Sequence, residues 1–184
     1  MKTVFFDVDT QIDFLFPAGA LYVPGAERIL PAVAALNQRA PLLISTMDAH
    51  AEDDAEFAVY PHHCVVGTTG QQKPACTLLE KRAVIPAAAD GVRQFLVEKQ
   101  KLDCFTNPNL LPLLDQLSAD RYVVYGVVTE ICVRHAAFGL LKTGKPVEIV
   151  TDAVCALNED QAQKMFAEFS AAGGKLSTAR DFPG

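Results

Sequence analysis

The chain has 184 residues, half of them hydrophobic, which fits a single domain over residues 1–184 with an ample core. The net charge of −6 and the lack of a basic cluster argue against nucleic acid and anionic membranes as partners. No apolar run approaches the roughly 20 residues that a membrane-spanning helix needs. Aspartates interrupt the first apolar run before a secretory leader could form, so we expect a cytoplasmic protein. The oligomeric state stays open, with a homo-oligomer as one alternative.

Short apolar runs alternate with amphipathic stretches along the chain. In chain order, the periodicity predicts a strand over 3–8, a helix over 24–38, strands over 42–46 and 94–98, a helix over 109–117, a strand over 121–127, a helix over 129–142, a strand over 147–151, a helix from Asn158 to Gly173, and a short strand over 175–177. We expect Thr129 to cap its helix, and Asn158 with Gln161 to form a capping box. The alternation predicts an α/β fold, a three-layer αβα sandwich around a mostly parallel, Rossmann-like sheet.

Three residues with reactive side chains follow predicted strands: Asp9, Lys99 and Cys132. In sheets of this class, ligands bind beyond the carboxyl ends of the strands. A thiol, a carboxylate and an ammonium together make a coherent nucleophile system. The alternatives are an aspartate that forms a turn, a solvated lysine and a cysteine that packs as a small apolar residue.

Cys132 has the most activating setting among the five cysteines. It falls in the first turn of a predicted helix, where unpaired amides and the helix dipole are expected to lower the pKa of a thiol. Cys64 lies in a polar loop beside two histidines, which leaves a metal-binding or redox role open for it. The odd count, without a C-x-x-C pair, predicts free thiols rather than a disulfide framework.

The loop after the second predicted strand concentrates carboxylates and imidazoles. It contains three of the four histidines of the chain, and its candidate ligands are Asp48, His50, Glu56 and His63. Carboxylate and imidazole ligands suit zinc, manganese or iron. The alternative is a solvated acidic loop with incidental histidines.

Three segments carry a resemblance to a known superfamily. Residues 9–14 match an Asp-x-Gln-x-Asp-Phe motif, residues 98–105 are similar to a stretch that carries a lysine, and residues 126–133 match Gly-x-x-Thr-x-x-Cys-Val. These motifs are typical of the isochorismatase-like cysteine hydrolases, and the likeness extends from the first strand to about residue 152.

The resemblance assigns a role to each of these segments. It implies that Asp9, Lys99 and Cys132 are the catalytic residues, with Cys132 as the nucleophile. It also implies a cis peptide bond between Val127 and Val128, and an oxyanion site formed by backbone amides of Val128 and Cys132.

Within the superfamily, the chain looks most like the nicotinamidase/pyrazinamidase branch, because His63 stands in a Pro-x-His-Cys-Val-x-Gly-Thr run. The resemblance implies one divalent metal ion, zinc in first place with iron and manganese as alternatives, held by Asp48, His50, Glu56 and His63. The implied reaction converts nicotinamide, or a close pyridine carboxamide, to the acid and ammonia through a thioester. This reaction belongs to NAD salvage.

The substrate is therefore expected to be a small-molecule amide. By resemblance the metal ion binds its pyridine nitrogen, while Phe14 and Tyr60 flank its ring. Tyr60 stands where this branch often has a tryptophan.

Two other functions stay open at this point. A metal-free hydrolase of the same superfamily would act on isochorismate or on a carbamoyl or ureido compound with the same three catalytic residues. A non-catalytic domain would use the histidine-containing loop to bind a metal or a partner. The presence of Asp9, Lys99 and Cys132 together favours an enzyme.

Overall fold

The computed structural model describes residues 1–85 and 91–183. Its strands form one seven-stranded sheet in the order β3-β4-β2-β1-β5-β6-β7, and every neighbouring pair is parallel. The strands are β1 (Thr3–Val8), β2 (Leu42–Asp48), β3 (Arg82–Val84), β4 (Gln94–Lys99), β5 (Arg121–Val127), β6 (Val147–Cys155) and β7 (Lys175–Ser177). The α-helices are α1 (Ile12–Leu15), α2 (Leu30–Arg39), α3 (Leu110–Leu117), α4 (Arg134–Leu141) and α5 (Glu159–Ala171). The predicted α/β fold is confirmed.

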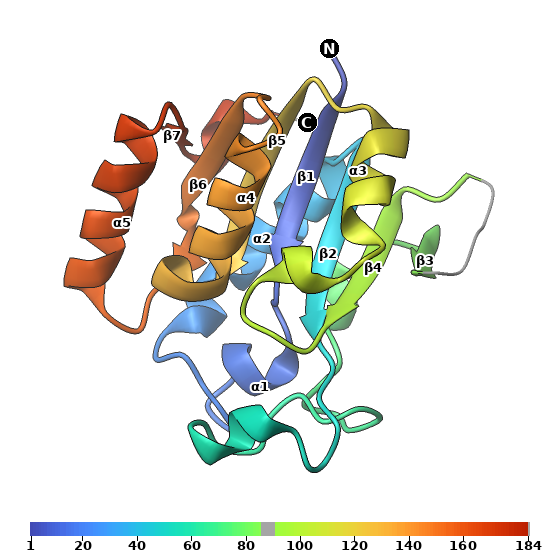
Figure 1. The fold of residues 1–184 in the computed structure, drawn as a ribbon, viewed down its shortest axis with the longest axis vertical. Helices are drawn as coiled ribbons and strands as arrows, with labels where there is room; N and C mark the ends of the chain where they lie inside the picture. The colour runs from blue at the N-terminus through green and yellow to red at the C-terminus, as the bar shows by residue number, and fades with distance from the viewer. Residues whose placement is uncertain (86–90, 184) are drawn as a thin grey trace.

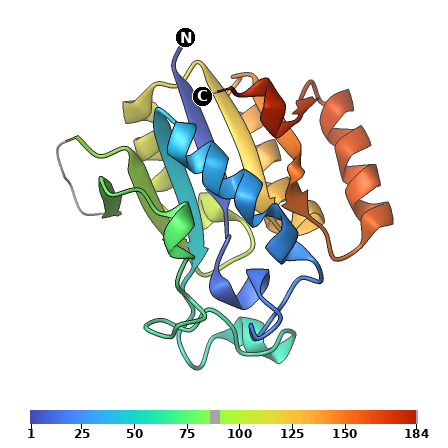
Figure 2. The same cartoon turned by 180° about the vertical axis from the view of Figure 1, so that it is seen from behind.

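Helices cover both faces of the sheet. The helices α3, α4 and α5 lie on the face turned toward the viewer in Figure 1, and α2 crosses the opposite face in Figure 2. The central strand β1 is buried along its whole length, with Val4 and Phe6 in the core on one face and Phe5 in the core on the other. A strand between two helical layers has to be apolar on both sides, which explains the continuous apolar run in the sequence.

Two predicted helices open with a turn that is not α-helical. The predicted helix over 24–38 starts as a 3₁₀ turn at Ala26, directly after the left-handed Gly25 with φ of 86°, and becomes α-helical at Leu30. The predicted helix over 129–142 opens with a π-helical turn over Thr129–Val133. Thr129 lies inside this turn and makes no side-chain cap, so that expectation was wrong.

Other sequence signals had mixed outcomes. The Asn158 side chain accepts a hydrogen bond from the Gln161 amide at the start of α5, as one half of a capping box does. The strand β3 and the helix α1 were not predicted, since elements of three and four residues are too short to show a period. No helix among the described residues is long and apolar enough to cross a membrane.

The sheet brings one end of its central strands together. The carboxyl ends of β1, β2, β4 and β5 point toward the same edge, where α1 and the loop after β2 lie in Figure 1. In the register of the β2–β4 pair, Asp48 lies opposite Lys99. This edge therefore carries the residues that the sequence marked as reactive.

Candidate active site and metal centre

The structure brings Asp9, Lys99 and Cys132 into contact, and we call these three residues the nucleophile cluster. The Lys99 Nζ atom lies 2.9 Å from Asp9 Oδ2 and 3.7 Å from Cys132 Sγ. It also donates a hydrogen bond to Asp48 Oδ1. All four side chains are buried, so water does not screen the charges from one another.

The backbone around Asp9 directs its carboxylate toward Lys99. Asp9 follows the last residue of β1 and has a left-handed backbone with φ of 48°, which is uncommon outside glycine. Its amide donates to Thr46 O at 3.2 Å, and Thr46 Oγ1 donates to Asp9 Oδ1 at 2.6 Å. The strained residue is thus held by the neighbouring strand β2.

Cys132 lies in the π-helical turn that follows β5. The peptide bond between Val127 and Val128 is cis, as the resemblance implies. The Val128 carbonyl accepts hydrogen bonds from the amides of both Ile131 and Val133. The second of these bonds spans five residues, which gives the turn its π geometry.

Burial raises the pKa of the Cys132 thiol well above its ordinary value, although the Lys99 ammonium opposes the shift. The expected lowering by the helix start is therefore wrong, because removing water from a thiolate outweighs the nearby positive charge. Burial alone would lower the pKa of Lys99, but the charges of Asp9, Cys132 and Asp48 hold it well above its usual range. The cluster thus rests as an ammonium and a neutral thiol.

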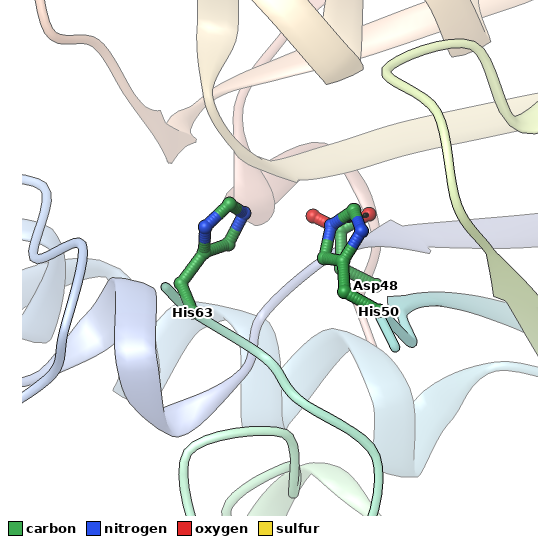
Figure 3. A group of neighbouring side chains, drawn as sticks. All are labelled: Asp48, His50 and His63. Atoms are coloured by element: carbon green, nitrogen blue, oxygen red, sulfur yellow. Dashed lines mark ion pairs between the residues drawn. The ribbon is translucent and has the colours of Figure 1, made fainter. Parts of the chain in front are cut away.

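A second group of side chains, Asp48, His50 and His63, lies next to the nucleophile cluster, and we call it the ligand triad. One ligand atom from each residue lies within 4.8 Å of the others, and all three residues are buried. Figure 3 shows the three side chains reaching the same region from two segments of the chain. The sequence had assigned these three residues to one metal site.

The chemistry of the ligand triad fits a divalent ion. His50 Nδ1 lies 3.0 Å from Asp54 Oδ2, and His63 Nδ1 lies 2.7 Å from Pro61 O. These acceptors favour protonation at Nδ1 and leave the Nε2 lone pairs available as ligands. Among the described residues, the buried His50 Nε2 atom has no hydrogen-bond partner. Two imidazoles and a carboxylate are a common ligand set for zinc.

Glu56 lies at the border of this site. Its Oε1 atom is 3.9 Å from His63 Nε2, but the residue does not fall within the ligand triad. The structure therefore groups three of the four predicted ligands closely and places the fourth beside them.

Burial shifts the titration of several groups here. It raises the pKa of Asp48 to about 6, although Lys99 opposes the shift. Burial lowers the pKa of His63, which favours the neutral imidazole that a metal needs. Burial also raises the pKa of Cys64, and its amide donates to Asp13 Oδ2 at 2.7 Å. Among the described residues, Cys64 is not part of the group formed by Asp48, His50 and His63.

Three buried polar residues support the site, and the sequence did not identify them individually. Gln11 accepts from the Asp48 amide at 2.7 Å and donates to the Asp48 carbonyl at 2.8 Å. Asp13 holds the backbone next to His63, and Thr46 holds Asp9. Gln11 and Asp13 stand at defined positions of the first motif, so that motif was the available signal. Thr46 carried none, because its partner is 37 residues away.

One pocket connects the two groups. Asp9 and Cys132 line it together with Asp48, His63 and Glu56. The rest of its lining is apolar and aromatic: Phe14, Leu21, Val23, Tyr60, Leu102, Val127, Val128, Ile131 and Leu157. Both predicted substrate contacts, Phe14 and Tyr60, thus lie in the lining, with the ring centroid of Phe14 at 5.4 Å from that of His63. No lysine or arginine is among the residues of the described chain that line this pocket.

Comparison with known proteins places this arrangement in a family. The sequence model of the Isochorismatase domain matches residues 3–181. The chain belongs to the isochorismatase family. It is therefore a hydrolase of this family, as the resemblance implied.

Several family members are similar over nearly the whole chain. A nicotinamidase of Acinetobacter baylyi is 25% identical over 95% of this chain and 91% of its own length. The pyrazinamidase of Pyrococcus horikoshii, solved in complex with zinc, has a TM-score of 0.81 and 26% identity, covering 97% of this chain and 99% of its own. PnC1 from L. infantum, solved in complex with nicotinate, has a TM-score of 0.81 and 27% identity, covering 97% and 93%. These relatives match the branch of the isochorismatase family that the histidine-containing loop indicated.

Proposed function

We propose that this isochorismatase-family protein hydrolyses nicotinamide, or a close pyridine carboxamide, to the carboxylic acid and ammonia. The observation that carries the proposal is the shared pocket of the nucleophile cluster and the ligand triad. A thiol with a carboxylate and an ammonium can attack an amide carbon, and the adjacent triad can hold an ion. The similarity to nicotinamidases and to a zinc-bound pyrazinamidase supports this choice.

Asp48, His50 and His63 would hold one divalent ion, with Glu56 close enough to act directly or through water. Zinc suits this ligand set best, and iron and manganese are the alternatives. When bound, the ion would supply a Lewis-acid contact to the ring nitrogen of the substrate.

The first chemical steps would use the nucleophile cluster. Asp9 accepts the proton of the neutral Cys132 thiol as the sulfur attacks the carboxamide carbon. Lys99 stabilises the negative charge on Cys132 and Asp9 during this step. The backbone amides of Val128 and Cys132 would donate hydrogen bonds to the oxyanion, an arrangement worth about 3 kcal/mol for each donor in comparable sites.

The remaining steps return the cluster to its resting state. Asp9 gives its proton to the departing nitrogen, so that ammonia leaves and a thioester remains on Cys132. Asp9 then accepts a proton from the water that attacks the thioester. The carbon–sulfur bond then breaks, the acid leaves, and Asp9 returns its proton to the Cys132 thiolate, which restores the neutral thiol.

The lining of the pocket favours an aromatic amide over isochorismate. Apart from Asp9, Asp48, Glu56 and His63, the lining is apolar or aromatic, and the part of the chain that the structure describes adds no lysine or arginine to it. Lys99 is fully buried behind these groups and already paired with two of them. A substrate with two carboxylates would lose water at both against this apolar lining, whereas an uncharged ring can pack between Phe14 and Tyr60.

Ammonia release from nicotinamide by the purified protein tests the proposal, with metal analysis on the same sample. We expect turnover of nicotinamide and about one divalent ion per chain. A metal-free protein that cleaves isochorismate or a carbamoyl or ureido compound, but not nicotinamide, would favour the metal-free alternative. Bound metal without any turnover would favour the non-catalytic alternative.

A further inference from the structure

The carboxylate of Glu130 connects two segments of the chain. One is the π-helical turn Thr129–Val133, which carries Cys132 and which we call the nucleophile turn; the other is the loop that follows β6. Glu130 stands two residues before Cys132, in the π-helical turn. Its Oε1 atom accepts hydrogen bonds from the Leu157 amide at 3.0 Å and from the Asn158 amide at 2.7 Å. One carboxylate oxygen thus binds two consecutive amides of a loop 27 and 28 residues away.

This loop forms part of the wall of the substrate pocket. Leu157 lines the same pocket as Cys132 and Phe14. The residue is 50% exposed, so the protein itself covers only half of it. An apolar side chain that borders a pocket and stays half exposed can gain contacts when an apolar ring enters.

The loop has an anchor on its other side as well. Asn158 caps α5 through its hydrogen bond from Gln161, while Glu130 holds the amides of Leu157 and Asn158. Without the Glu130 carboxylate, α5 would still hold Asn158, but Leu157 would lose its connection to the nucleophile turn. The β5–β6 pairing holds the chain up to Cys155, and beyond it the Glu130 carboxylate holds the Leu157 amide near the turn that carries the thiol.

We propose that Leu157 is a specificity-determining residue that packs on the ring of the substrate, and that Glu130 is the positioning residue that holds it. This inference rests on the proposed function for the identity of the ring. Among the described residues, Glu130 accepts its hydrogen bonds from Leu157 and Asn158 and not from the nucleophile cluster, so its loss weakens binding of the ring more than the chemical step. The pocket accordingly prefers aromatic carboxamides to small aliphatic amides such as acetamide.

Four variants of the full chain test the proposal. Glu130→Gln keeps a carbonyl acceptor for the two amides, whereas Glu130→Leu removes it. Leu157→Ala removes the apolar wall, and the fourth variant combines Glu130→Leu with Leu157→Ala. The first measurement is hydrogen exchange at the Leu157 and Asn158 amides without substrate, and the second is kcat and KM for nicotinamide and acetamide.

We expect faster exchange at both amides in Glu130→Leu and near wild-type exchange in Glu130→Gln. Glu130→Leu and Leu157→Ala should each raise KM for nicotinamide about tenfold, the scale of a lost apolar contact, with kcat changed less than about twofold. The double variant should be no worse than the poorer single variant, because both changes remove the same contact. Acetamide kinetics should stay the same in all four.

A matched control separates this role from general stability. Glu168→Gln removes the Arg134–Glu168 ion pair of 2.9 Å. This pair joins α4, which follows the nucleophile turn, to α5, but it lies outside the pocket. It should change neither measurement.

Unchanged exchange in Glu130→Leu, additive effects in the double variant, or a fall in kcat without a rise in KM would overturn the proposal. A wild-type protein that releases no ammonia from nicotinamide contradicts the proposed function and the ring selection with it, while the exchange data alone decide the role of Glu130.

Discussion

The Nζ atom of Lys99 lies 3.7 Å from the Sγ atom of Cys132, and the same ammonium contacts the carboxylates of Asp9 and Asp48. The positive charge of this buried ammonium is therefore already compensated by two carboxylates, which leaves less of it to stabilise a thiolate. A third negative charge in this space would be poorly compensated, which agrees with the raised pKa of the thiol. In the proposed reaction Cys132 therefore needs a base at the moment of attack, and Asp9 is our proposal for that base.

Replacing the proposed nucleophile should abolish turnover. We expect Cys132→Ala to have no measurable amidase activity while it stays folded, because the change removes only the sulfur. Alkylation of Cys132 should inactivate the enzyme, and it is best measured in a Cys76→Ser background because Cys76 is exposed. Residual ammonia release by Cys132→Ala, with normal sensitivity to iodoacetamide at another cysteine, would contradict this assignment.

Removing the proposed base should lower kcat strongly. We expect Asp9→Asn to reduce kcat by about 10²- to 10⁴-fold, with little change in the melting temperature. Thr46→Val should reduce kcat less, because Asp9 loses the 2.6 Å hydrogen bond but keeps its charge, and Thr46→Ser should restore it. An Asp9→Asn protein with near wild-type kcat would show that the aspartate only shapes the end of β1.

Metal removal should stop nicotinamide hydrolysis without changing the thiol. We expect His50→Ala and His63→Ala to lose the bound ion and the activity, as a chelator does. His62→Ala is the matched control, because His62 is exposed and stacks on Phe57 at 4.2 Å instead of joining the ligand triad. Cys132 should still react with iodoacetamide in all of these proteins, and benzamide, which lacks the ring nitrogen, should be a poor substrate. Full activity in the chelated protein would contradict the metal-dependent mechanism.

Metal affinity should fall as the pH is lowered through about 6. The raised pKa of Asp48, about 6, means that the ion-free protein binds a proton at this carboxylate below that pH. An incoming ion must displace this proton, so affinity should fall about tenfold for each further unit of pH. Zinc titrations from about pH 5 to pH 7 measure this slope. A flat affinity over that range would show that Asp48 stays ionised without the metal.

A second buried ion pair should matter for stability rather than for chemistry. Lys73 Nζ lies 3.3 Å from Asp7 Oδ2, and neither side chain is accessible to water. Lys73→Met leaves the Asp7 charge buried without its partner, and we expect the free energy of unfolding to fall by about 3–5 kcal/mol. Denaturant unfolding measures this loss, and kcat at low temperature should be nearly normal. Removal of the exposed Arg134–Glu168 pair should change stability by less than about 1 kcal/mol.

The sequence alone determined the order of the main elements and most of the reactive residues. The mainly apolar runs over residues 3–8 and 121–127 coincide with β1 and β5, because a strand between two helical layers buries both of its faces. Asp9 and Cys132 were recognisable because they follow such runs within short motifs. These signals are local, so they can be found in a single stretch of chain.

Only the tertiary structure decided how these residues act on one another. The helix-start argument predicted a lowered pKa for Cys132, but the loss of water around the thiol, which depends on packing from the whole fold, reverses the shift. Lys99 contacts both Asp9 and Asp48, and these contacts likewise need the three strands β1, β2 and β4 in register. The bond of Glu130 to Leu157 crosses 27 residues, and no local pattern marks it. Motifs identify the reactive groups, whereas burial and long-range hydrogen bonds set their protonation and their positions.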